Sequence, residues 1–157
     1  MLYQFCSEIP NIPEDLCNLS VEEIRNIPDK FTGVKTPEGI VPRYTLHTAP
    51  TAIEQFLKPY FDVDANFAFQ LITSDLPIHK DFGRTQCFNY IINTGGNVNT
   101  VWYDDDLNKI ESVVFPERKW HSIRVDNFHN VTDVTSTRIA ITVWHKDESA
   151  VGELRRS

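Results

Sequence analysis

Short segments rich in β-branched and aromatic residues fill the chain from about Asn66 onward, and they constrain the fold more than any other feature. They are residues 67–72, 87–92, 100–103, 111–115, 120–125 and 138–144. Residues of these types favour strands, while the Gly, Pro, Asn and Asp clusters between the segments favour turns. Many short strands with close turns, and little helix after Phe61, predict an antiparallel sandwich or barrel.

The first third of the chain carries a different pattern, with several prolines and two helix signals. Ser20 and Glu23 have the spacing of a capping box, and Thr51 and Glu54 repeat that spacing. The second signal precedes an apolar stripe at helical spacing, formed by Ile53, Phe56 and Leu57. We therefore predict two short helices that pack against the sheet.

The length of 157 residues suits one domain with a buried core, and no repeat, low-complexity tract or linker divides it. Hydrophobic residues make up 41% and charged residues 24%, which is ordinary for a globular protein. We predict a mainly β fold, a jelly roll, in a single domain. Residues 1–65 are expected to form a helical or irregular brace, and residues 66–157 the β-core.

Charge and cysteine content limit the partners and the location. The net charge of −7 disfavours nucleic acid and anionic membranes as partners. No apolar segment reaches the roughly 18 residues that span a bilayer. Three cysteines at irregular spacing, without a CxxC motif, indicate reduced thiols. We predict a cytoplasmic protein, in its own cell or in a host, without membrane contact; its oligomeric state is left open.

Two histidines each stand two residues before an aspartate, and one of these pairs is placed to bind a metal. With 5 histidines and 12 aspartates in 157 residues, roughly 0.4 such pairs arise by chance. His79 and Asp81 follow a strand and precede a turn containing Gly83, so alternation puts both side chains on one face. His145 and Asp147 stand at the end of the last strand. We predict the first pair as metal ligands and the second as a solvated strand end.

A third ligand has to come from a strand that is distant in sequence. His121 and His129 are both in range. His121 can equally be a surface or core-edge residue, whereas His129 stands shortly before the final strand. Two histidines and one carboxylate form the ligand set of a non-haem Fe(II) site that keeps one face of the metal open. We therefore favour His129 as the third ligand.

The final strand carries an arginine nine positions after His129. One face of that strand holds Arg138, Ala140, Thr142 and Trp144, and the other holds Ile139, Ile141 and Val143. An arginine that points into a barrel is costly unless a bound carboxylate pairs with it. Alternation alone leaves both arrangements open: Arg138 faces inward, or the isoleucine face does and Arg138 faces water.

Three stretches of the second half of the chain together resemble the Fe(II)/2-oxoglutarate-dependent oxygenases, especially small prolyl-4-hydroxylase-like and phage-type members. Residues 76–84 resemble the HxD strand and turn of that family. Residues 87–96 resemble the next strand with its "YLN…GG" stretch, and residues 128–144 resemble the "HxV…R…W" ending. Each motif is short, so the resemblance depends on their order and spacing.

The resemblance implies a double-stranded β-helix in which His79, Asp81 and His129 are the catalytic residues that hold Fe(II). It implies 2-oxoglutarate as cosubstrate and O2 as oxidant, with release of succinate and CO2. Arg138 would pair with the far carboxylate of 2-oxoglutarate. The substrate that is hydroxylated at a C–H bond would be a protein side chain or a small molecule.

One strand departs from the family pattern. The segment after the HxD turn is one residue longer before its asparagine than the family's "YLN" stretch. Either Asn89 or Tyr90 can therefore face the cosubstrate, because neighbours on a strand point to opposite faces. We favour Tyr90, as a hydrogen-bond donor to the cosubstrate carboxylate.

Two other classes of protein fit part of the pattern. A cupin-like metalloprotein of another reaction class, such as an isomerase, shares the jelly roll and the metal ligands but does not need Arg138. A non-catalytic jelly-roll binding protein needs neither, and its histidines are incidental. The metal content and the role of Arg138 separate these alternatives from the oxygenase.

Overall fold

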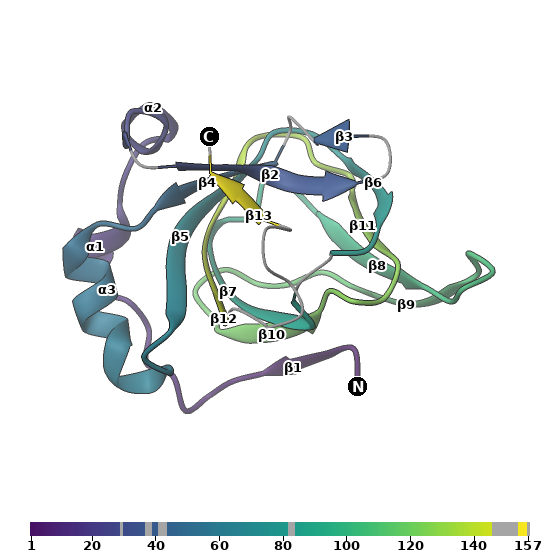
Figure 1. The fold of residues 1–157 in the computed structure, drawn as a ribbon, viewed down its shortest axis with the longest axis horizontal. Helices are drawn as coiled ribbons and strands as arrows, with labels where there is room; N and C mark the ends of the chain where they lie inside the picture. The colour runs from purple at the N-terminus through teal and green to yellow at the C-terminus, as the bar shows by residue number, and fades with distance from the viewer. Residues whose placement is uncertain (29, 37–38, 41–43, 82–83, 146–153, 157) are drawn as a thin grey trace.

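The strands form two antiparallel sheets that enclose a common interior (Figure 1). The computed structural model describes residues 1–28, 30–36, 39–40, 44–81, 84–145 and 154–156. Within these residues the larger sheet has the order β1 (Tyr3–Phe5), β10 (His121–Arg124), β7 (Gln86–Asn93), β12 (Arg138–His145), β5 (Ala65–Ile72), β4 (Tyr44–Thr48), β2 (Lys30–Thr36) and β13 (Leu154–Arg156), with β3 (Gly39–Ile40) paired to β2. The smaller sheet has the order β6 (Leu76–His79), β11 (His129–Thr132), β8 (Asn99–Tyr103) and β9 (Lys109–Val113). The predicted mainly β jelly roll is confirmed.

The helices lie together on one side of the larger sheet, beside β5 (Figure 1). They are α1 (Glu14–Cys17), α2 (Val21–Arg25), α3 (Thr51–Leu57) and the 3-10 helix η1 (Lys58–Tyr60). Ile53 and Leu57 of α3 are fully buried, which confirms the predicted apolar stripe at those positions. None of the helices in the described residues is long and apolar enough to cross a membrane.

Strand β12 is buried on both of its faces, and this answers the question that alternation left open. Ile139, Ile141 and Val143 belong to the core cluster that the helices cover. Arg138 lies on the opposite face and lines the interior between the two sheets. The arrangement in which Arg138 faces water is therefore wrong, because the helices shield the isoleucine face and leave the other face to look inward.

The segment of residues 1–65 contributes more than the expected helical or irregular brace. Strands β1, β2 and β4 come from it and join the larger sheet. β4 pairs with the C-terminal part of β5, from Tyr44 opposite Ile72 to Thr48 opposite Ala68. Without β4, the backbone groups on that side of β5 would stay unpaired at a sheet edge. Pro10, Pro13, Pro28 and Pro50 lie between strands and helices, so they do not prevent the pairing.

The turn between β7 and β8 needs glycine at one position. Gly95 has a φ of +77°, and a Cβ atom built there would lie 2.6 Å from the carbonyl oxygen of Ser136. That Cβ would also lie 3.0 Å from the backbone nitrogen of Arg138. A side chain at this position would therefore push against the start of β12, which carries the arginine.

The two predicted helix caps differ in the structure. The hydroxyl of Ser20 accepts a hydrogen bond from the backbone N–H of Glu23, whose carboxylate accepts one from the backbone N–H of Ser20. The predicted capping box at Thr51 is wrong, because α3 begins one residue earlier than that box requires. Pro50 takes the N-cap position there, and it has no side-chain acceptor.

We expect Ser20→Ala to lower the free energy of unfolding by about 1 kcal/mol, because it removes the acceptor of the cap. Thr51→Ala is the matched control, since it truncates the hydroxyl at the start of α3 without removing a cap hydrogen bond. Its effect should stay within about 0.5 kcal/mol. Urea denaturation of both variants measures the difference, and equal effects would contradict the assignment of the cap.

Candidate metal centre

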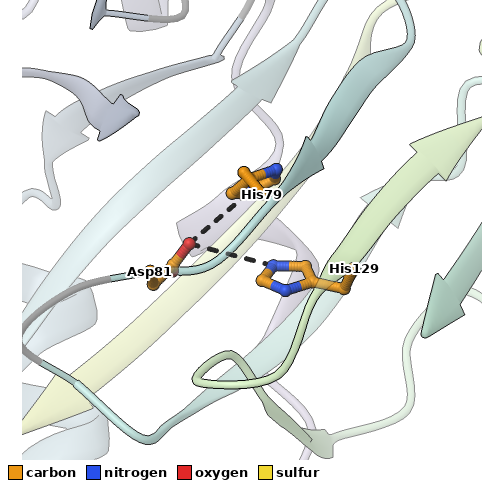
Figure 2. A group of neighbouring side chains, drawn as sticks. All are labelled: His79, Asp81 and His129. Carbon is orange, nitrogen blue, oxygen red and sulfur yellow. Dashed lines mark ion pairs between the residues drawn. The ribbon is translucent and has the colours of Figure 1, made fainter. Parts of the chain in front are cut away.

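The three predicted ligands come together because two strands of the smaller sheet pair in register. His79 is the last residue of β6 and His129 the first of β11, and the two lie directly opposite each other. Residues in opposite positions of an antiparallel pair project to the same face. Their rings are 4.4 Å apart between centroids. Asp81 follows β6 by two residues and turns its carboxylate toward both rings (Figure 2).

The spacing of the ligand atoms suits a single metal ion. Oδ1 of Asp81 lies 3.4 Å from Nε2 of His79 and 3.8 Å from Nε2 of His129. All three ligand atoms lie within 4.8 Å of one another, and all three residues are buried. Adjacent ligands that each stand about 2.1 Å from a metal are about 3 Å apart. The cluster is therefore close to the geometry of a loaded site.

Both histidines are held by hydrogen bonds on the side away from the cluster. Nδ1 of His79 donates to the carbonyl oxygen of Pro77 at 2.6 Å, and Nδ1 of His129 donates to that of Asn127 at 2.7 Å. A carbonyl oxygen only accepts, so the proton of each neutral ring sits on Nδ1. This leaves the lone pair of each Nε2 directed at the cluster, as metal-binding histidines require.

Asp81 is held by an arginine that sequence reasoning did not single out. Nε of Arg84 donates to Oδ2 of Asp81 at 3.0 Å, and Nη2 lies 2.8 Å from the same oxygen. Nη2 also donates to the hydroxyl of Tyr44, which accepts a second hydrogen bond from the Gln70 amide. Oδ1 of Asp81 has no hydrogen-bond partner in the described part of the chain.

Burial and the neighbouring charges together determine which of the three residues are protonated. Burial alone would raise the pKa of Asp81, but Arg84 and the two imidazoles lower it well below its usual range. Burial lowers the pKa of His129 to about 4. Burial also opposes the charged form of His79, yet the nearby carboxylate of Asp81 leaves the pKa of His79 raised. Asp81 is therefore ionised and His129 neutral at neutral pH.

Arg138 lines the same cavity and is buried without a counter-ion. It has no hydrogen bond or ion pair with any described residue, and its Nε is a buried donor without an acceptor. Burial lowers its pKa to about 10, so it remains charged at neutral pH. Arg138 lies opposite Ile72, which lies opposite Tyr44 on the far side of β5. These three side chains therefore project from one face into the cavity.

Asn89 and Tyr90 take opposite sides of β7, and the favoured choice of Tyr90 is wrong. Asn89 lines the cavity, and it lies opposite Thr142 of β12, on the same face as Arg138. Tyr90 belongs to the helix-covered core, where its ring packs against Trp120 at 5.2 Å. The apolar body of Tyr90 fills that core, and this determines which of the two neighbours points inward.

The other candidate histidines lie outside the cluster. His121 lines the same cavity but stacks on Phe115, with ring centroids 3.6 Å apart. Burial, with a smaller effect from Arg138, lowers the pKa of His121 to about 3. His145 pairs with the exposed carboxylate of Asp62 at 3.6 Å. Asp147 and the turn residue Gly83 lie outside the described residues.

Comparison with solved structures identifies a shared fold. A prolyl-4-hydroxylase from Pseudomonas putida superposes with a TM-score of 0.58 and 13% identity, over 94% of this chain and 93% of its own. A prolyl hydroxylase from Trichoplax adhaerens, solved with a hypoxia inducible factor peptide fragment, gives a TM-score of 0.52 and 14% identity, over 79% and 72%. No protein-family model matches the sequence, and no curated protein matches it. The fold that the sequence motifs implied is confirmed.

We expect His121 to make the free energy of unfolding of the metal-free protein fall as the pH falls from about 6.5 toward 3. In this window the unfolded chain takes up a proton at His121, whereas the folded chain, whose pKa is about 3, does not. The free energy of unfolding therefore falls with pH. His121→Asn cannot take up that proton, so its loss of stability between pH 7 and pH 4.5 should be smaller by about 1–3 kcal/mol. Urea denaturation at both pH values measures this, and an equal loss in both proteins would contradict it.

Proposed function

We propose that this protein is an Fe(II)/2-oxoglutarate-dependent dioxygenase that hydroxylates a C–H bond of a protein side chain or a small molecule. The reaction would consume O2 and 2-oxoglutarate and release succinate and CO2. One observation carries the proposal: three residues that could hold a metal, and an arginine without a counter-ion among the described residues, line the same buried cavity.

The residues of the cluster fit Fe(II). Two neutral imidazole nitrogens and one carboxylate oxygen are the donors that non-haem Fe(II) oxygenases use, and they leave further coordination positions open. Oδ1 of Asp81 is a buried anionic oxygen that no described donor satisfies. A cation bound between this oxygen and the two Nε2 atoms would satisfy all three. His79, Asp81 and His129 would thus hold the iron.

Arg138 fits the far carboxylate of 2-oxoglutarate. A buried guanidinium without a partner is costly, and an ion pair with a bound carboxylate offsets that cost. Two neighbours provide further polar groups in the cavity. The Tyr44 hydroxyl already accepts two hydrogen bonds, which leaves its own proton to donate, and Asn89 lies on the same face as Arg138. We propose Asn89 and Tyr44 as additional contacts of the cosubstrate.

The alternatives account for fewer of these features. A cupin-like metalloprotein of another reaction class would use the metal ligands but has no use for a buried, unpaired Arg138. A non-catalytic jelly-roll protein explains neither Arg138 nor the unsatisfied oxygen of Asp81. Buried polar groups without partners are uncommon in native proteins and need a reason. The dioxygenase hypothesis explains both groups, because iron would bind Asp81 and the cosubstrate would pair with Arg138.

The chain would contribute positioning and a dry site. When bound, iron supplies the electrons that activate O2 beside the keto acid. Arg138 would hold the cosubstrate in one orientation, so that its reacting groups are already positioned before the reaction begins. Apolar side chains that line the cavity, among them Ile72, Ile123 and Val131, would keep water away from the reacting groups. The backbone carbonyls behind His79 and His129 would keep both rings in place.

Anaerobic titration with Fe(II) and then 2-oxoglutarate tests the proposal, by the visible charge-transfer band of the chelate. We expect the band in the wild type and its loss in Asp81→Ala, which removes a metal ligand. Arg138→Met should still bind metal but should need about 10- to 100-fold more 2-oxoglutarate, because a hydrogen-bonded charge pair is lost.

Tyr90→Phe is the matched control, since Tyr90 points away from the cavity, and its titration should equal that of the wild type. Bound metal without a band would favour the cupin-like class. A wild-type protein that takes up no metal would leave the jelly roll as a binding scaffold.

A further inference from the structure

The Asp81–Arg84 pair is the only ion pair between a predicted metal ligand and an arginine in the described residues, and both partners are buried in the cavity wall. Its geometry is one-sided. Two nitrogens of Arg84 lie within 3.0 Å of Oδ2, while Oδ1 lies between the two imidazole Nε2 atoms. The arginine thus occupies one carboxylate oxygen and leaves the other free.

We infer that Arg84 is a positioning residue that holds Asp81 as a ligand through a single oxygen and thereby keeps one coordination position of the metal open. The inference rests on the proposed metal site. A carboxylate can bind a metal through one oxygen or through both. With Oδ2 engaged by a buried guanidinium, the second mode would require breaking that pair inside the cavity.

The open position matters for the proposed reaction. Three protein ligands on an octahedral metal leave three positions. A keto acid bound through two oxygens would take two of them, and one position would remain open. If Asp81 bound through both oxygens, it would take one of these three positions. A group that fixes the carboxylate to one oxygen therefore bears directly on turnover.

Arg84 is itself held from several strands, which suits a positioning role. Its Nη2 donates to the Tyr44 hydroxyl of β4, and Gln70 of β5 donates to the same hydroxyl. The guanidinium also lies 5.4 Å from the ring centre of Trp144 in β12. The guanidinium therefore cannot move away from Oδ2 without disrupting its contacts to Tyr44 of β4 and Trp144 of β12.

Stability alone does not account for the pair. A buried ion pair is often no more stable than well-packed apolar residues of similar volume, because both charges lose their hydration. In metal sites, groups that hydrogen-bond to a ligand orient it, and losing one of them weakens metal binding about 10- to 100-fold. Arg84 contacts only one oxygen of the Asp81 carboxylate, Oδ2, and this matches the second role.

The test uses Mn(II) as the probe, with the metal-free protein of residues 1–157. Mn(II) affinity is measured by electron paramagnetic resonance, and line broadening in 17O-enriched water counts the water molecules on the bound ion. We expect about three waters in the wild type. Arg84→Met should bind Mn(II) about 10- to 100-fold more weakly and carry about two waters, because the freed Oδ2 turns to the metal.

Arg84→Lys keeps the charge but loses the two-pronged contact, so it should fall between the wild type and Arg84→Met in affinity. It also decides the test if Arg84→Met does not fold. The matched control is Arg124→Met, since Arg124 makes a similar pair with Asp126 at 2.6 Å that is half exposed and outside the cavity. Its affinity and water count should equal those of the wild type.

The outcomes separate the two proposals. A wild type that binds no Mn(II) overturns the proposed metal site, and the role of Arg84 with it. A wild type that binds Mn(II), with unchanged affinity and water count in both Arg84 variants, overturns only the role of Arg84. A weaker affinity with an unchanged water count also overturns it, because a merely structural role would weaken binding without altering the coordination.

Discussion

The two-sided burial of β12 is the constraint on which the rest of the structure depends. Its isoleucine face packs under the helices, so its other face has to look into the interior between the sheets. That orientation carries Arg138 into the cavity, where it can be reached only by a ligand or by the side chains of the cavity wall. A shift of this strand by one residue would exchange the two faces, burying Arg138 under the helices. The packing of a purely apolar cluster thus sets the electrostatics of the site.

The cluster of ligands depends on register in the same way, and this part was predictable from the sequence. His79 and Asp81 are two residues apart in the sequence, so their side chains share a face in an extended segment. His129 stands shortly before the final strand, and this position favoured it as the third ligand. Asn89 and Tyr90 were not predictable. Which of two neighbours points inward depends on the pairing of β7 with β12, and that pairing shifts at a bulge between Ile139 and Ala140. A bulge adds one residue to one strand, so counting residues along the motif from the sequence alone fails to give the face.

Arg84 and Tyr44 show a second limit of sequence reasoning. Arg84 is one charged residue among many after a turn, and nothing in its spacing distinguishes a buried partner of Asp81 from a solvated side chain. Tyr44 lies in a segment whose prolines predicted irregular structure, yet β4 pairs with β5 and directs it inward. Both residues meet the site only through contacts between strands far apart in sequence. Pairings of that kind follow from tertiary packing, which local patterns do not encode.

Unsatisfied polar groups gather in the cavity. Four buried polar atoms without a hydrogen-bond partner among the described residues belong to side chains that line it: Asp81 Oδ1, Arg84 Nη1, His121 Nε2 and Arg138 Nε. A buried polar atom that is left without a partner costs about 1–3 kcal/mol. Any ligand that supplies a cation at Asp81 and an anion at Arg138 relieves part of that cost, and it binds the folded chain in preference to the unfolded one. By mass action such a ligand stabilises the fold in proportion to its affinity. A ligand that carries both charges would therefore satisfy several of these groups at once, because Asp81 and Arg138 line the same cavity.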